Sequence, residues 1–323
     1  MSSSDKIKVV CGTMSFGEAG TLGNPHINTV EDAGKVLDVF RRHGYTELDS
    51  ARAYGSGTTE KLLGETKWQD RGLTVGTKLY PSAGHPRERG AGYTHKPEDI
   101  RRGCLDSLKA LGAEKMDIFY LHGPDRKNPY EDTLRAVNEL HQEGRFNRFG
   151  VSNYMAWEVA QMCEISRKHG WIQPTVYEGH YHALQRRVED ELFSCLRYYG
   201  ISFYAYSPLA SGFLTGRYER GQEITNFHLK HLWNASYYDA LDIIKPAAQK
   251  HGFTVSEVAL RWLSHHSMLK SEHGDAVILG AGSVKNFESN LADLEKGSLP
   301  DDIVEALNAA WLACKGTAGK YHY

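Results

Sequence analysis

Short β-branched or aromatic runs alternate with longer helical stretches along the 323-residue chain, and this alternation constrains the fold most strongly. The runs expected to form strands are 8–12, 46–49, 73–78, 116–121, 145–151, 174–178, 201–206 and 276–280. The helices expected between them are 29–44, 97–112, 132–140, 155–169, 188–199, 254–264 and 285–293. The pattern predicts one α/β domain, residues 1–323, folded as a single (β/α)8 TIM barrel. A doubly wound sheet is the alternative.

The charge balance and cysteine content narrow the class of protein. A net charge of −2 and a pI near 6.8 give no sign of a nucleic-acid or membrane partner. There is no apolar segment long enough to cross a membrane and no signal-peptide core at the start. The five cysteines are scattered and form no CxxC pair, which predicts reduced thiols and a cytoplasmic location. The cysteines are expected to be structural, and Cys11, at the end of the first strand, is the one thiol to test for reactivity.

Polar side chains gather where several of the expected strands end. At the C-terminal rim of a parallel barrel such residues face one shared pocket. The residues in this position are Asp49 with Tyr54 just after it, Lys78, His122, and the pair Ser152 and Asn153. Each alone is more simply a structural residue, and Asp49 with Lys78 also fits an interior ion pair. Their common placement predicts an active site on the rim.

Four of these residues form a set that could donate a proton. A phenol has a pKa of about 10, and a neighbouring ammonium lowers it by favouring the phenolate. Lys78 would act in this way on Tyr54, with Asp49 holding the lysine and His122 orienting a carbonyl oxygen. Such a set protonates a developing alkoxide while a hydride arrives from elsewhere. Because no side chain delivers hydride, a nicotinamide cofactor is implied.

A glycine-containing turn offers a place for the cofactor's phosphate. Residues 280–285 read Gly-Ala-Gly-Ser-Val-Lys, follow the last expected strand and open a helix. A G-x-G-x-x-G fingerprint is absent from the sequence, which argues against a Rossmann dehydrogenase. Two long loops, 81–94 and 207–238, are expected on the same C-terminal rim and would shape the substrate pocket.

The other histidines and aromatic residues in the sequence are expected to have structural roles and not functional ones. His180, His182 and the segment 228–231 could suggest metal ligands, but no cysteine or carboxylate pattern completes a site, so no metal is expected. Four aromatic residues are expected to be packing residues: Phe203, Tyr204, Trp262 and Trp311.

The motifs together resemble the aldo-keto reductase superfamily. Those that carry the resemblance are 48–55, 77–78, 121–122, 150–153 and 204–209. Further motifs are similar to the aflatoxin-aldehyde reductase branch: 119–125, 171–177, 209–217, 260–267 and 273–280. The resemblance runs from Gly12 to about Trp311, and the tail beyond it has no counterpart in the pattern.

The resemblance implies NADPH-dependent reduction of aldehydes, with dialdehydes, ketoaldehydes and semialdehydes as candidate substrates. It makes Tyr54 the general acid, Lys78 and Asp49 its tuning pair, and His122 the residue that orients the substrate. The residues it assigns to NADPH or NADP+ are Met14, Asp49, Ser152, Asn153, Glu178, Tyr206, Ser207, Pro208, Leu209, Ser211, Gly212, Arg217, Gly282, Ser283, Lys285, Asn286 and Asn290.

Two residues depart from the family pattern. Asn286 stands near the usual position of an arginine for the 2′-phosphate, which leaves Lys285 as the substitute. Glu178 stands where a glutamine is usual, and two interpretations stay open. An ionised Glu178 would favour the positively charged oxidised nicotinamide. Alternatively, the pocket raises its pKa and the protonated acid imitates the glutamine.

A second hypothesis belongs to a different class. The β-subunits of potassium channels are in the same superfamily, so the chain could be a cofactor-binding regulatory subunit with little turnover. A homodimer is the candidate assembly under the reductase hypothesis. The physiological substrate stays open, because specificity lies in the two variable loops.

Overall fold

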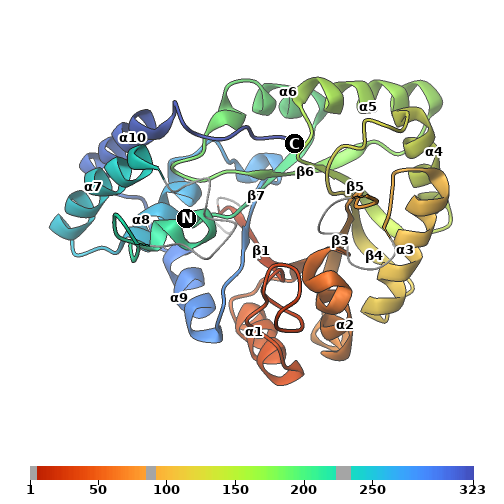
Figure 1. Cartoon of the computed structure of the whole chain (residues 1–323), viewed down its shortest axis with the longest axis horizontal. Helices are drawn as coiled ribbons and strands as arrows, with labels where there is room; N and C mark the ends of the chain where they lie inside the picture. The colour runs from red at the N-terminus through yellow and green to blue at the C-terminus, as the bar shows by residue number, and fades with distance from the viewer. Residues whose placement is uncertain (1–5, 85–91, 223–233) are drawn as a thin grey trace.

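The computed structural model describes residues 6–84, 92–222 and 234–323 and confirms the closed parallel barrel (Figure 1). The strands pair in chain order, and the last pairs with the first. Their bounds are β1 Lys8–Gly12, β2 Glu47–Asp49, β3 Thr74–Leu79, β4 Met116–Leu121, β5 Phe146–Ser152, β6 Pro174–His180, β7 Ser202–Tyr206 and β8 Ala276–Leu279. Each expected strand is therefore found with its ends shifted by at most two residues.

Helices surround the barrel, as Figure 1 shows. Their bounds are α1 Val30–Arg42, α2 Thr58–Glu65, α3 Pro97–Leu111, α4 Tyr130–Gln142, α5 Ala156–His169, α6 Leu192–Tyr199, α7 Ala235–Lys250, α8 Val255–His265, α9 Val284–Leu294 and α10 Asp301–Cys314. Side-chain caps begin several of them: Thr29 accepts from the Asp32 amide at 3.1 Å, and Ser283 accepts from the Asn286 amide at 3.2 Å. These caps satisfy amides that the first helical turn leaves without partners.

One expected helix was placed wrongly. The stretch 188–199 splits into a single 3-10 turn, Arg187–Glu189, and α6, which begins at Leu192. Glu191 lies between them with φ −148°, outside the helical region. Its carboxylate accepts a hydrogen bond from the Tyr321 hydroxyl at 2.5 Å, so a contact with the distant tail holds the chain in this non-helical turn.

α2 connects β2 to β3 and follows Tyr54 almost directly, after a 3-10 turn over Tyr54–Gly57. Two helices are additional to the alternation, because α7 and α8 both lie between β7 and β8, and α10 follows α9. α10 packs against α7, and Figure 1 shows the tail beyond α10 running from there towards β6. Residues far along the chain therefore return to the rim of the barrel.

Buried side chains fill the barrel interior instead of leaving a channel. The interior cluster consists of Val10, Ile118, Tyr120, Val176, Tyr204, Ala276 and Ile278. The four aromatic residues expected to pack, Phe203, Tyr204, Trp262 and Trp311, are all buried.

A charged network closes the N-terminal end of the barrel. Glu47 is bonded by Lys8 and by Arg148, whose guanidinium also donates to Asp117 at 2.6 Å and to the Tyr204 hydroxyl at 3.2 Å. Because this end is sealed by paired charges, a pocket for a substrate belongs at the opposite, C-terminal rim.

Across the described residues, each helix is too short or too polar to cross a bilayer.

Candidate active site

An ion pair between neighbouring strands forms the centre of the site. Asp49 ends β2, and Lys78 is the penultimate residue of β3. The Lys78 ammonium donates to both oxygens of Asp49, at 2.6 and 2.5 Å, and to the Ser50 carbonyl oxygen at 2.9 Å. Both side chains are buried, Lys78 completely. The predicted pairing of Asp49 with Lys78 is therefore present in the geometry.

Tyr54 lies against this pair. The turn after β2 brings its ring to 5.1 Å from the Lys78 nitrogen, measured to the ring centroid. Burial raises the pKa of the Tyr54 phenol, the charge of Lys78 lowers it, and the charge of Asp49 raises it again. The net direction is upward. Lys78 acts on the Tyr54 pKa in the expected direction, but burial outweighs it, so the phenol holds its proton at neutral pH.

His122 faces Tyr54 across the pocket. It directly follows β4, and its ring centroid lies 5.6 Å from that of Tyr54 at an interplanar angle of 80°. Tyr80 approaches the other side, with a centroid distance of 5.7 Å. Burial and the nearby Lys78 charge lower the pKa of His122 well below its usual value. The imidazole is therefore neutral, and one ring nitrogen is a hydrogen-bond donor.

Polar residues from β5 and β7 join the same rim. Asn153 donates to the His122 carbonyl oxygen at 2.9 Å and accepts from the Tyr206 hydroxyl at 2.8 Å. Asn153 has φ 66°, a left-handed conformation that a non-glycine residue adopts at some cost. It also donates to the Ser152 hydroxyl at 2.9 Å. The structure thus brings Ser152, Asn153 and Tyr206 together beside His122.

Glu178 reaches the same ion pair from β6. One of its oxygens lies 3.2 Å from the Lys78 nitrogen, and the side chain is buried. Burial and the neighbouring Asp49 charge raise the pKa of Glu178 well above the usual range.

The segment after β7 turns sharply over the rim. Three of its non-glycine residues have positive φ: Ser207 at 56°, Ala210 at 50° and Ser211 at 55°. Such strain tends to occur where the backbone itself serves a function. Leu209 and Gly212 lie in the same turn, Pro208 is buried, and Arg217 donates to the Tyr218 hydroxyl at 2.7 Å. Residues 223–233 of the long loop lie outside the described part of the chain, as do 85–91 of the other.

The predicted phosphate segment lies at the start of α9. Ser283 caps the helix, and Lys285 and Asn286 are exposed in its first turn, while Asn290 lies one turn further. Gly282 precedes the cap, and a Cβ there would meet the His26 ring at 3.4 Å. Met14, which follows β1, is 38% exposed. Among the contacts of the described residues, none joins this segment to the ion pair of Asp49 and Lys78.

Sequence reasoning missed residues that reach the site from elsewhere. The ring of His180 stacks on that of Tyr206, with a centroid distance of 5.2 Å and an interplanar angle of 3°. Because His180 lies two residues after Glu178 on β6, its side chain is expected on the same face of the strand, and this spacing could have identified it. Tyr323, in the tail, donates its amide to the Asn153 carbonyl oxygen at 3.1 Å, and its own carbonyl oxygen accepts from Arg126 at 2.8 Å. Burial raises the pKa of the Tyr323 phenol, and a hydrogen bond with the Tyr206 side chain partly offsets this rise. No local pattern could have placed this tail.

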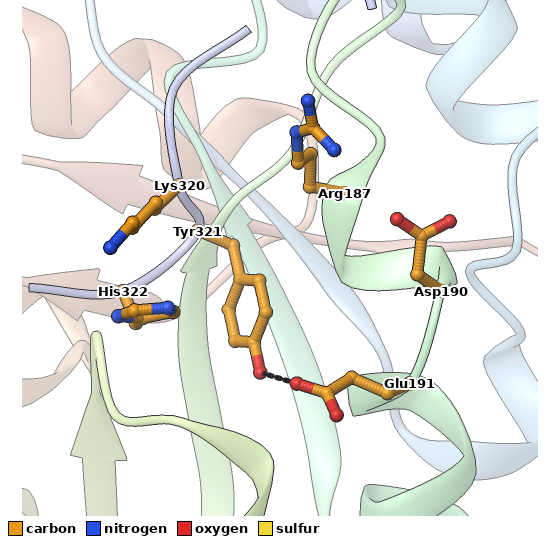
Figure 2. A pocket seen from close by; sticks show the side chains of 6 residues that line it. All are labelled: Arg187, Asp190, Glu191, Lys320, Tyr321 and His322. Carbon is orange, nitrogen blue, oxygen red and sulfur yellow. Dashed lines mark hydrogen bonds between the residues drawn. The ribbon is translucent and has the colours of Figure 1, made fainter.

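A small cavity of about 300 Å³ accompanies the tail (Figure 2). Its lining residues are Arg187, Asp190, Glu191, Lys320, Tyr321 and His322. Figure 2 shows the Tyr321 hydroxyl directed at Glu191, and the same oxygen accepts from the Ala156 amide at 3.1 Å. The lining residues tie the tail to the barrel and do not include Asp49, Tyr54, Lys78 or His122.

Two sequence expectations concern metals and thiols. Within residues 6–84, 92–222 and 234–323 there is no group of three potential metal ligands, and His228 and His231 lie outside these ranges. The structure argues against a reactive thiol at Cys11. The thiol is fully buried, and burial together with the Asp49 charge raises its pKa, so the reactive thiolate is disfavoured.

Comparisons with known proteins agree with this site. The model of the aldo/keto reductase family matches residues 8–312. An aldo-keto reductase of Pseudocercospora fijiensis is 50% identical over 88% of this chain and 99% of its own. Human aflatoxin B1 aldehyde reductase member 2 is 39% identical over 95% of this chain and 87% of its own. A glycerol dehydrogenase structure from Gluconobacter oxydans superposes with a TM-score of 0.74 at 22% identity, covering 95% of each chain, and shows the same fold.

A parallel barrel with a phenol beside a buried lysine–aspartate pair and a neutral histidine on its rim fits an oxidoreductase that reduces carbonyl groups. The chain belongs to the aldo/keto reductase family. The resemblance to the aflatoxin-aldehyde reductase branch is confirmed by relatives of that name at about 40% identity. Because these relatives are named as reductases, the enzyme is favoured over the regulatory subunit.

Proposed function

We propose that the protein reduces aldehydes to alcohols with NADPH, and that Tyr54 supplies the proton. The observation that carries this proposal is the contact of the Tyr54 ring with Lys78, which is itself bonded to Asp49, opposite the neutral His122. Dialdehydes, ketoaldehydes and semialdehydes are the substrates to test first, since two relatives in this comparison carry aldo-keto or aldehyde reductase names.

The residues around the pocket fit a nicotinamide. In the described part of the chain, His122 Nδ1 and Glu178 Oε2 are buried side-chain atoms without a hydrogen-bond partner, which is costly unless a ligand completes them. Ser152, Asn153 and Glu178 would hold the carboxamide, and Tyr206 would lie against the ring. When bound, the nicotinamide supplies the hydride. The strained turn at 207–212 and the start of α9 would bind the phosphates.

The protein's own groups handle the proton. His122, neutral, donates a hydrogen bond to the carbonyl oxygen of the substrate and orients it. Tyr54 gives its proton to that oxygen as negative charge develops there. The Lys78 ammonium stabilises the phenolate that remains, and Asp49 fixes the ammonium in place.

The first experiment is turnover. Purified protein is mixed with NADPH and a nitrobenzaldehyde, and the loss of NADPH absorbance is followed across a panel of aldehydes. Steady turnover that rises with aldehyde concentration supports the proposal. Tight NADPH binding without turnover on the panel would instead favour the regulatory subunit.

Cofactor preference gives a prediction about Lys285. A charge-assisted contact with the 2′-phosphate is worth about 1.5–3 kcal/mol, so NADPH is expected to bind about 10–100-fold more tightly than NADH. Lys285→Met should remove most of this preference and leave the NADH affinity unchanged. Fluorescence titration of both cofactors measures it. Lys168→Met, an exposed lysine in the last turn of α5, is the control that should change neither affinity. Equal affinities of the unmodified protein for the two cofactors would contradict the preference.

A further inference from the structure

Glu178 is the buried acid for which the proposed mechanism gives no protonation state. It lies on β6, where its register partners are Ser152 of β5 and Tyr204 of β7. The residue is 2% exposed. Its Oε2 atom lies 3.2 Å from the Lys78 nitrogen, yet among the described residues this oxygen has no hydrogen-bond partner.

The lysine has no donor left for this oxygen. An ammonium has three N–H groups. In Lys78 the three hydrogen bonds go to the two carboxylate oxygens of Asp49 and to the Ser50 carbonyl. An ionised Glu178 would therefore be a buried carboxylate with an oxygen that receives no hydrogen bond, which is costly in a protein interior.

The charge count points the same way. Asp49 and Glu178 both lie within 3.2 Å of a single cation, Lys78. When two carboxyl groups share one site, they hold one proton between them. Asp49 accepts two hydrogen bonds from the ammonium and is the better place for the negative charge. The proton therefore belongs on Glu178, and burial with the Asp49 charge raises its pKa accordingly.

The surrounding elements bring no second cation to this oxygen. The titratable groups that face Glu178 from the described part of the barrel and tail are Asp49, Tyr54, Lys78, Tyr120, His122, Tyr206 and Tyr323. His122 is neutral, and the pKa of each of these phenols is raised above its usual value, so the phenols hold their protons. Lys8 and Arg148 are bonded to Glu47 at the other end of the barrel.

We propose that Glu178 is a positioning residue that keeps a proton on the Asp49–Lys78–Glu178 cluster, so that the cluster is neutral when Tyr54 donates. The acid also presents one O–H donor where an ionised carboxylate could only accept. This role rests on the proposed reduction by Tyr54. If Glu178 lost its proton, the added negative charge would raise the pKa of Tyr54 further and weaken it as an acid.

Infrared spectroscopy tests the protonation state without turnover. The difference spectrum between the unmodified protein and Glu178→Gln at neutral pH should contain the C=O stretching band of a protonated carboxylic acid. Labelling glutamate with ¹³C in the unmodified protein should shift this band, which assigns it to glutamate even if the variant folds poorly. Glu47→Gln is the control, because Glu47 is bonded by two cations and should contribute no such band. Absence of the band from the unmodified protein at neutral pH would overturn the proposal.

Thermal unfolding gives a second readout. The pKa of Glu178 is raised in the folded protein, so its contribution to stability is present below the unfolded value of about 4.3 and is lost as the pH rises towards the folded value. Glu178→Gln does not titrate. The Tm of the variant relative to the unmodified protein should therefore increase between about pH 5 and pH 9, on the order of 2 °C. A Tm difference that does not change with pH would contradict the proposal.

The two proposals fail in different ways. A protein that shows the acid band but turns over no aldehyde loses the proposed function and keeps the buried acid. A protein that reduces aldehydes but lacks the band keeps the function and loses the role of Glu178.

Discussion

Tyr54→Phe is expected to lower the turnover number by about 10²–10⁴-fold, the usual contribution of a general acid. The substitution removes only the hydroxyl. The ring that lies 5.1 Å from the Lys78 nitrogen and 5.6 Å from the His122 centroid is retained. Cofactor affinity should therefore change little, and the loss should appear in the chemical step. Stopped-flow measurement of a single turnover, together with a fluorescence titration of NADPH, separates the two quantities.

Tyr80 offers a matched control for this substitution. Its ring meets His122 at 5.7 Å and nearly perpendicular, as the Tyr54 ring does, whereas the Lys78 nitrogen lies over the rings of Tyr54 and Tyr120. Tyr80→Phe should reduce turnover by less than about tenfold, because no proton is transferred from this hydroxyl. If Tyr54→Phe kept more than about a tenth of the original turnover, Tyr54 would not be the general acid.

The pH dependence of the forward and reverse reactions gives a further test of Tyr54. The pKa of Tyr54 is raised by burial, so the phenol stays protonated through the neutral range and reduction should persist there. The reverse reaction needs the phenolate and should speed up as the pH rises. The pH dependence of the reverse reaction should disappear in Tyr54→Phe, and the rate of reduction should be low throughout the neutral range.

Much of this site could be predicted because strand ends are local features of the sequence. The tips of β2, β3 and β4 carry Asp49, Lys78 and His122, and the parallel register brings these tips to one rim. The barrel fold could be predicted from the alternation of strand-like and helical stretches along the sequence. The reactivity of Cys11 could not be decided from the same pattern, because the position of a residue along a strand does not show which way its thiol faces.

Contacts between distant segments could not be predicted. Tyr323 reaches Asn153 across 170 positions of sequence, and Tyr321 holds Glu191 in the turn that delays the start of α6. The sequence showed that Glu178 replaces a glutamine, but it could not show that every N–H of Lys78 is already used. That fact decides the protonation of Glu178, and it depends on geometry at the scale of single hydrogen bonds.

Lys78→Met is the second substitution with a large expected effect. It removes the one cation bonded to Asp49 and lying 3.2 Å from Glu178, and breaking a buried pair in this way costs about 3–5 kcal/mol of stability. It also removes the charge that lowers the pKa of Tyr54 and stabilises its phenolate. Turnover should fall by at least about 10²-fold. The basic limb of the pH–rate profile should move to higher pH, because the pKa of the phenol rises when the cation is lost.

Lys8→Met separates the electrostatic role of Lys78 from a loss of stability. Lys8 is bonded to Glu47 as Lys78 is bonded to Asp49, and both acids lie on β2, but Lys8 belongs to the closed end of the barrel. Its loss should lower the Tm and leave the pH–rate profile in place. The profiles are compared under conditions where a deuteride isotope effect shows that chemistry limits the rate. If the basic limb of Lys78→Met does not move under those conditions, the lysine only positions its neighbours, and its charge does not tune Tyr54.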